Sequence, residues 1–208
     1  MLEKNLIFIA RNFIKYKFFN SLFTGLSIGS IFTIYAPLDP SIFSIGGILL
    51  AIGMLLLARL YEKIMNCNYF YKISLFVESI MLSLVLFFLF KPYSYMSALL
   101  IYSGYQITFM FGSYLLRAET LIGKKRKMFT FFDTAKQMGY LIGLGLSYIF
   151  YKILEFVFYI KEHNEQVYLL HYILLICQIC VIFYIFNSFK KQHEKSSIFN
   201  NLNSKFIR

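Results

Sequence analysis

Few side chains in this sequence can do acid–base chemistry, and several of those stand inside long apolar runs. Glu78 follows roughly one and a half turns of apolar sequence in the run 73–90. Asp133 and Lys136 lie three residues apart, so a helix would place them on one face, where they can pair. A charged side chain in a membrane interior costs about 2.5–3.5 kcal/mol on insertion scales. Each of these residues is therefore a candidate for a functional site.

Two further polar side chains, Gln106 and His171, interrupt apolar runs. We expect Glu78 to face the protein interior with a partner from another helix, and Lys136 and Arg117 are candidates by depth. A polar path through the membrane is predicted from Glu78, Gln106, Asp133, Lys136 and His171. The alternative is that Gln106 and His171 each bond one neighbouring helix and do nothing else. Charges near the end of a run can also extend to the membrane interface.

Residue patterns for enzymatic chemistry are weak. Cys177 and Cys180 form a C-x-x-C pair, which can serve redox or zinc chemistry, but they lie in an apolar run without a second pair. We expect buried cysteines. Ser103 and His171 suggest a nucleophilic pair, yet no G-x-S motif precedes the serine. There is no phosphate-binding loop. The sequence predicts no enzyme, no catalytic residue, no metal site and no cofactor.

The composition is that of a membrane protein. Of 208 residues, 59% are hydrophobic and 15% are charged, whereas a water-facing surface needs roughly a quarter charged. Basic residues outnumber acidic ones by 21 to 10, which can indicate nucleic acid as a partner. Their positions beside apolar runs favour another interpretation, that they flank membrane helices. The expected partner is the lipid bilayer, not nucleic acid.

Six apolar runs are each close to the 20 residues that cross a bilayer, and they predict an all-α polytopic membrane protein with six transmembrane helices. They cover approximately 18–36, 42–61, 73–90, 95–116, 129–151 and 167–189. Three parts follow: a basic cytoplasmic or interfacial segment at 1–17, a six-helix domain at 18–189, and a polar cytoplasmic tail at 190–208. Richness in Phe, Tyr, Ile, Lys and Asn suggests an AT-rich bacterial genome, and hence the inner membrane.

Positive charge alternates along the chain. The N-terminus, the second break, the fourth break with the start of the fifth run, and the C-terminus hold 18 of the 21 Lys and Arg residues. The other breaks carry none, Lys91, and the pair Lys152 and Lys161. Because basic loops stay in the cytoplasm, both termini are predicted to be cytoplasmic.

Small residues recur at four-residue spacing in three runs. They are Ser21, Gly25 and Gly29 in the first, Gly104, Thr108 and Gly112 in the fourth, and Ala135, Gly139, Gly143 and Ser147 in the fifth. Helices in lipid associate by close packing, which small residues permit. General helix packing is one interpretation; the other is that these three helices line a moving cavity.

The break after the second run reads Ala58-Arg-Leu-Tyr-Glu-Lys-Ile-Met-Asn66. It resembles a degraded helix 2–3 loop motif of the major facilitator superfamily, G-x-L-a-D-R-x-G-R-R. Glu62 stands at the Asp position and Lys63 at the Arg position, while Cys67 and Asn68 replace the trailing basic pair. The spacing of a further four residues is similar to that from helix four into helix five of the superfamily: Glu119, Arg126, Gly139 and Gly143.

The resemblance implies the N-terminal six-helix half of such a transporter, over about 18–189. In the family, loop and helix-four charges form a cytoplasmic network that latches the two halves. By that resemblance, the network here would comprise Glu62, Lys63, Arg117, Glu119 and Arg126. The expected function is to move, or help to move, a small solute together with a second six-helix unit, as a homodimer or with another subunit. The alternative is a non-transporting membrane scaffold or assembly subunit.

Overall fold

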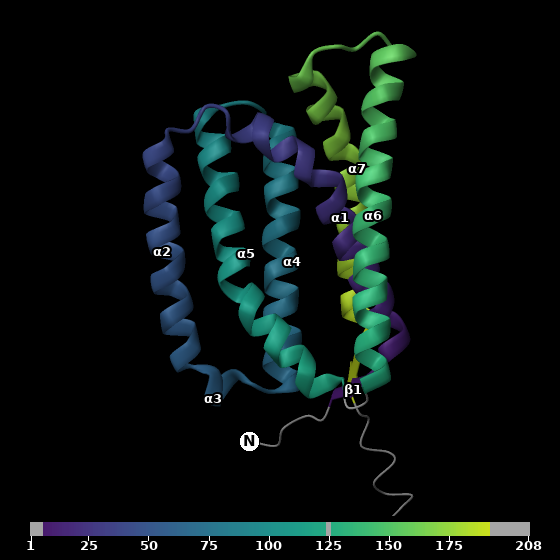
Figure 1. Ribbon diagram of the computed structural model, residues 1–208. Coiled ribbons are helices and arrows are strands. Elements are labelled where there is room, and N and C mark those ends of the chain that lie inside the picture. The colour runs from purple at the N-terminus through teal and green to yellow at the C-terminus, as the bar shows by residue number, and fades with distance from the viewer. Residues whose placement is uncertain (1–5, 124–125, 192–208) are drawn as a thin grey trace, which may run out of the picture.

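The computed structural model describes residues 6–123 and 126–191. Within these residues, six long helices and one short helix follow each other between two short strands (Figure 1). The elements are β1 (Leu6–Phe8), α1 (Ala10–Tyr35), α2 (Pro40–Arg59), α3 (Tyr61–Ile64), α4 (Cys67–Phe90), α5 (Tyr95–Ile122), α6 (Arg126–Phe156), α7 (His163–Asn187) and β2 (Phe189–Lys191). The prediction of an all-α protein is confirmed.

Local sequence explains where three of the helices begin. Pro40 occupies the first turn of α2, where its missing N–H removes no intrahelical bond. The Asn66 side chain accepts a hydrogen bond of 3.0 Å from the Tyr69 N–H at the start of α4. Ser94 does the same for the Ser97 N–H at the start of α5, at 3.1 Å. Both are N-caps, which satisfy backbone donors that a helix start leaves unpaired.

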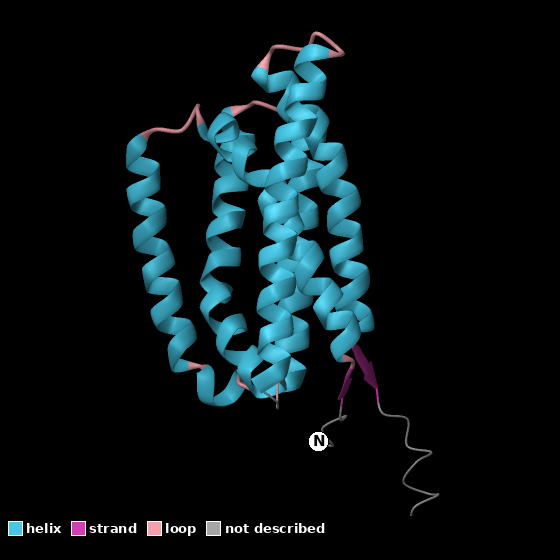
Figure 2. Ribbon diagram, turned by 45° about the vertical axis from the view of Figure 1, so that its right-hand side comes forward, coloured by secondary structure: helices cyan, strands magenta, loops and turns pink. Residues whose placement is uncertain are grey.

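The long helices lie side by side and most of them run nearly along one direction, whereas the C-terminal part of α1 is tilted across the bundle (Figures 1 and 2). α1 packs most extensively against α6 and also against α7, whereas α4 packs against α5 and α7. α2 lies at the edge and packs chiefly against α5. At the end opposite β1, α6 and the start of α7 extend beyond the other helices (Figure 1).

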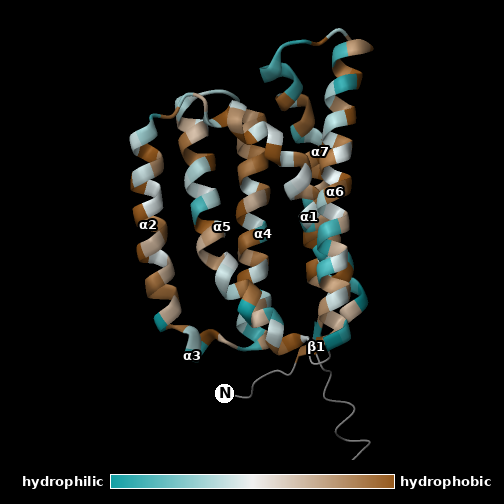
Figure 3. Cartoon of the chain, viewed as in Figure 1, coloured by the Kyte–Doolittle hydropathy of each residue, from teal (hydrophilic) through white to brown (hydrophobic). Residues whose placement is uncertain are grey.

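Four helices among the described residues are long and apolar enough to cross a membrane: α1, α2, α4 and α7. α5 and α6 were expected to span as well. They have 28 and 31 residues, but neither contains a stretch apolar enough to be counted with these four, and the hydropathy colouring shows polar residues along α6 (Figure 3). Large apolar side chains on the outer faces are exposed, such as Leu55 at 68% and Leu141 at 71%. These surfaces suit lipid.

The helices extend beyond several of the expected boundaries. α1 begins at Ala10, ahead of residue 18, because Phe13 and Tyr16 are buried against the rest of the bundle. α6 continues to Phe156, past the expected end at 151. Residues 1–5, Lys124, Lys125 and 192–208 of the predicted basic segments and tail lie outside the described residues.

A small antiparallel sheet joins the two ends of the described chain. Leu6 pairs with Lys191 and Phe8 with Phe189. The expected tail boundary at 190 therefore falls inside a strand. An aromatic cluster covers the adjoining helix ends, in which the rings of Phe13 and Phe132 lie 5.0 Å apart in an edge-on arrangement. This sheet and cluster hold the ends of α1, α6 and α7 together.

Candidate membrane-embedded binding cavity

A cavity of about 520 Å³ lies between α1 and α5, with α4 and α7 at its back. Its volume is in the range of small-molecule binding sites. Thr24 and Ile28 of α1 and Phe109 and Gly112 of α5 line it and are exposed, so the cavity opens between these two helices. Most of its wall is apolar. Its polar side chains include Tyr16, Lys17, Asn20, Ser74, Glu78 and Gln178.

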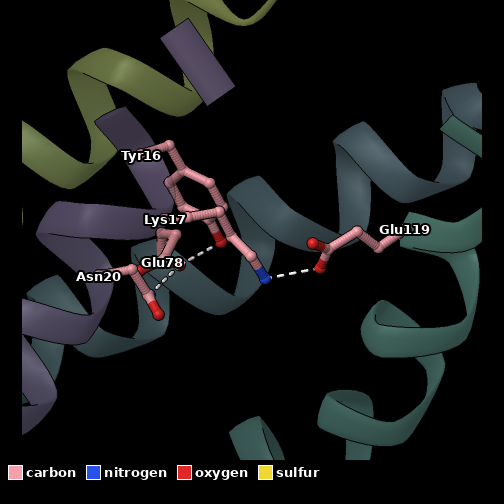
Figure 4. A network of polar contacts seen from close by, with 5 residues as sticks. All are labelled: Tyr16, Lys17, Asn20, Glu78 and Glu119. Atoms are coloured by element: carbon pink, nitrogen blue, oxygen red, sulfur yellow. Dashed lines mark hydrogen bonds and ion pairs between the residues drawn. The ribbon is translucent and has the colours of Figure 1, made fainter. Parts of the chain in front are cut away.

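Glu78 lies at the back of this cavity and is 2% exposed. Its Oε1 accepts hydrogen bonds from the Tyr16 hydroxyl and the Asn20 amide, each at 2.8 Å (Figure 4). Its Oε2 accepts a bond of 2.9 Å from Gln178 Nε2, which also donates to the Glu78 carbonyl oxygen at 3.0 Å. Three helices thus converge on one carboxylate, and all three donors are neutral.

Helix periodicity explains this convergence. Tyr16 and Asn20 are four residues apart on α1, so they project from one face. Ser74 and Glu78 have the same spacing on α4, and both line the cavity. A buried polar group is costly in an apolar surrounding unless it is hydrogen-bonded, which is why a carboxylate here requires several donors.

A second acidic residue, Glu119 of α5, has a different partner. Lys17 Nζ lies 2.6 Å from Glu119 Oε2 and forms an ion pair between α1 and α5 (Figure 4). The side chains are 19% and 8% exposed. The pair sits at the end of the cavity that lies towards α3 and β1. It links across the cavity two helices that otherwise make little contact.

The residues of the predicted polar path do not meet in one place. Glu78 and Lys136 line the same cavity, but Lys136 is on its exposed rim and forms no ion pair within the described residues. Asp133 is exposed and is not among the lining residues. The expected partners of Glu78, Lys136 and Arg117, are replaced by neutral donors. The reason is that α1 begins at Ala10, so that Tyr16 and Asn20 lie on one helix face and both reach the Glu78 carboxylate.

Gln106 and His171 lie in separate surroundings. Gln106 lines a second cavity of about 230 Å³ between α2 and α5, and its Oε1 has no hydrogen-bond partner among the described residues. The His171 ring lies against the Phe88 ring, with centres 3.9 Å apart and planes inclined by 31°, and its Nδ1 is hydrogen-bonded to the Val167 carbonyl at 2.7 Å. Neither side chain lines the cavity that holds Glu78.

The residues of the predicted cytoplasmic charge network do not form one cluster: four of the five are exposed and Glu119 is buried. Glu62 and Lys63 are exposed on the short helix α3, and Arg126 is exposed at the start of α6. Arg117 lies over the Tyr61 ring, 5.4 Å from its centre. Of these five residues, Glu119 alone forms an ion pair within the described part of the chain, and its partner, Lys17, was not in the predicted network. Glu62 and Lys63 of α3 form no ion pair among the described residues.

Three of the predicted packing glycines bring α1 and α6 into backbone contact. A Cβ on Gly143 would lie 2.5 Å from the Leu22 carbonyl oxygen, and one on Gly139 would collide with the Phe18 carbonyl oxygen. A Cβ on Gly25 would collide with the Tyr140 carbonyl oxygen. We call this contact the glycine seam; it comprises Gly25, Gly139 and Gly143. It holds α1 in the position from which Tyr16 and Asn20 reach Glu78.

The other predicted packing glycines have different surroundings. Gly104 faces the Leu84 side chain on α4, while Gly29 has only ordinary contact with Tyr151. A Cβ on Gly112 would meet nothing within 4 Å, because Gly112 borders the cavity.

The three cysteines are free thiols, and the Cys177 thiol donates a long hydrogen bond of 3.5 Å to the Phe19 carbonyl.

Sequence reasoning missed Tyr16, Lys17 and Asn20 as site residues. The apolar run begins only at residue 18, so apolar length alone does not predict that one continuous face of α1 carries these side chains. The signal was present: Tyr16 and Asn20 are at i and i+4, and Lys17 is beside them. Ser74, four residues before Glu78, could have been found in the same way.

Fold and composition define the class, an all-α protein with at least four helices able to span a membrane. No family model, no curated protein and no solved structure matches the chain. The function must therefore be argued from the cavity and its side chains.

Proposed function

We propose that this chain is a membrane transport unit that moves, or helps to move, a small solute across the bacterial inner membrane. In this proposal it resembles the N-terminal six-helix half of a major facilitator transporter and works with a second six-helix unit, as a homodimer or with another subunit. The observation that carries the proposal is the cavity of about 520 Å³ with a buried carboxylate at its back. Ionisable groups inside membrane proteins commonly mark solute or ion pathways.

The proposal includes six spans and cytoplasmic termini. At about 1.5 Å per residue, the 28 residues of α5 and 31 of α6 exceed the roughly 30 Å of a hydrocarbon core. The pairing of β1 with β2 supports termini on one side, and the basic loops support the cytoplasmic side. The polar faces of α5 and α6 would then be covered by other helices or by the second unit.

The cavity opens between α1 and α5, and this suits a half transporter. A complete transporter holds its solute between two units, near the middle of the membrane. Here α1 and α5 border the opening, and α2 lies beside α5 with a mostly exposed surface. A second six-helix unit placed over this side would close the cavity.

Two measurements on the purified full-length chain test the proposal. The first is its mass in lipid nanodiscs, where a dimer or a stable hetero-complex is expected. The second is uptake of radiolabelled alanine, glucose and 2-phenylethylammonium into proteoliposomes, compared with empty liposomes and with a Glu78→Ala variant. Uptake of any of these solutes that needs Glu78 supports transport. A stable monomer without uptake of any solute would count against it.

A membrane scaffold or assembly subunit is the second candidate. It is favoured by the positions of Gln106 and His171, which lie in separate surroundings and not on one polar path. A scaffold would remain in a stoichiometric complex with other membrane proteins whether or not Glu78 is intact. Purification of wild-type chain and Glu78→Gln from native membranes separates the two candidates. An unchanged complex without solute uptake favours the scaffold.

A further inference from the structure

The Glu78 carboxylate lies at the back of the cavity and forms no ion pair among the described residues, because the nearby Lys17 pairs with Glu119. The ion pairs among the described residues are Lys17 with Glu119, at this cavity, and Lys152 with Glu155, which lies elsewhere. Tyr16, Asn20 and Gln178 stabilise the carboxylate by hydrogen bonds but bring no positive charge. A buried charge is normally paired, because desolvation is costly.

The hydrogen-bond capacity at this point is also incomplete. An ionised carboxylate offers about four acceptor positions, and three are used here. Ser74 Oγ, one turn earlier on α4, is buried and has no hydrogen-bond partner among the described residues. Ser74 and Glu78 line the same cavity. Two acceptors on one helix face therefore remain available to an N–H donor.

The rest of the wall fits an apolar body. Phe13, Phe70 and Phe109 line the cavity together with aliphatic side chains of α1 and α5. Aromatic faces attract cations, and apolar walls bury hydrocarbon. Two lysines at the cavity could repel a bound cation, but the charge of each is compensated or screened in a different way. Lys17 is paired with Glu119 at 2.6 Å, whereas Lys136 is exposed, so solvent screens its charge.

We propose that the cavity binds a protonated amine with an apolar body, whose ammonium group donates hydrogen bonds to Glu78 Oε2 and Ser74 Oγ. The bound cation compensates the charge of Glu78, and its hydrocarbon part lies against the aromatic wall. This assignment names the solute class of the proposed transport unit and rests on that function only for its physiological meaning. Binding itself requires no transport.

The test is a binding assay on the full chain in detergent, by scintillation proximity with tritiated 2-phenylethylammonium. Unlabelled competitors of similar shape vary the charge: 2-phenylethylammonium, neutral 2-phenylethanol and anionic phenylacetate. We expect the ammonium to compete at least about tenfold better than the alcohol, since the hydroxyl can donate one hydrogen bond to the carboxylate but brings no positive charge to compensate it. Equal competition by the alcohol overturns the proposal, as does stronger competition by phenylacetate, which would indicate a site at Lys136.

Two variants locate the site. Glu78→Gln keeps the side-chain shape and is expected to weaken ammonium binding at least about tenfold, while Ser74→Ala is expected to weaken it about two- to tenfold. Matched controls are Glu165→Gln on α7 and Ser83→Ala on α4, both exposed. They should leave affinity unchanged. Unchanged affinity in Glu78→Gln overturns the proposal; if that variant unfolds, Ser74→Ala and the wild-type competition still decide.

The result of the binding assay can be distinguished from the result of the transport assay. Ammonium binding without uptake into proteoliposomes supports the site and counts against transport. Uptake of alanine or glucose without ammonium binding supports transport and overturns this solute class.

Discussion

The two faces of α1 meet their neighbours in opposite ways. Towards α6, the glycine seam brings the helices together at the level of the backbone. Towards α5, α1 borders a cavity and is linked across it by the side chains of Lys17 and Glu119. Backbone contact leaves no side chain that could change rotamer, whereas a link between two long side chains can break and re-form. We therefore expect α1 and α6 to stay together while the α1–α5 side changes shape.

The largest expected effect is at the glycine seam. Gly143→Ala places a methyl group 2.5 Å from the Leu22 carbonyl oxygen and 3.0 Å from Gly25 Cα, both backbone atoms that cannot rotate away. We expect the free energy of unfolding to fall by about 1–3 kcal/mol, which is typical of overpacking. Denaturant-induced unfolding in mixed micelles measures it.

The control is Gly145→Ala, two residues away on α6, where a Cβ would meet nothing within 4 Å. Alanine is the better helix former, so this variant should be unchanged or more stable by up to about 1 kcal/mol. If both variants lose the same stability, backbone contact is not what distinguishes this face of α1.

The second prediction concerns the cavity face. Glu78→Ala removes the common acceptor of Tyr16, Asn20 and Gln178 and leaves buried donors unpaired. We expect a loss of about 1–2 kcal/mol in the free energy of unfolding, because an unsatisfied buried donor loses its hydration without compensation. Glu78→Gln keeps an acceptor oxygen and should lose less. An Ala variant as stable as wild type would show that water already satisfies these donors.

Sequence patterns predicted the helices well and their contacts poorly. Apolar runs predicted six long helices, and the four-residue spacing of Gly139 and Gly143 indicated a face suited to close packing. The partner of Glu78 could not be predicted, because partner choice depends on how each helix is rotated and which helix lies beside it. The apolar residues of α7 surround it on all sides, so periodicity does not reveal that Gln178 points inward.

His171 is an example of the opposite error, in which a residue that looks functional in the sequence is occupied by packing contacts. A histidine in an apolar run suggests a functional group, but contact with the Phe88 ring and a bond to the Val167 carbonyl occupy it. The ring contact joins Phe88 of α4 to His171 of α7, which are far apart in sequence, so no local pattern encodes it.

The third prediction tests the link across the cavity. Glu119→Gln keeps the size of the side chain but removes the charge that pairs with Lys17 at 2.6 Å. The pair is mostly buried, so we expect a loss of about 1 kcal/mol in the free energy of unfolding, less than at the glycine seam. Cysteines introduced on α1 and α5 should also crosslink faster, or at more pairs of positions, in this variant than in the wild-type background. Unchanged stability and crosslinking would mean that the pair does not hold this side of α1.

The smallest effect is expected at the other ion pair, Lys152 with Glu155, which is exposed and lies within one helix beyond the expected end of the span. The hydrogen bond from Lys152 lowers the pKa of Glu155. A lowered pKa in the folded state contributes stability above the ordinary carboxylate pKa and loses it as pH falls through the folded value. Solvent screens this pair, so the thermal unfolding curves of wild type and Glu155→Gln should coincide between pH 7 and pH 3. If Glu155→Gln lost as much stability as Glu119→Gln, burial would not be what separates the two ion pairs. The ion pair between α1 and α5 would then stabilise the protein no more than an exposed pair within one helix.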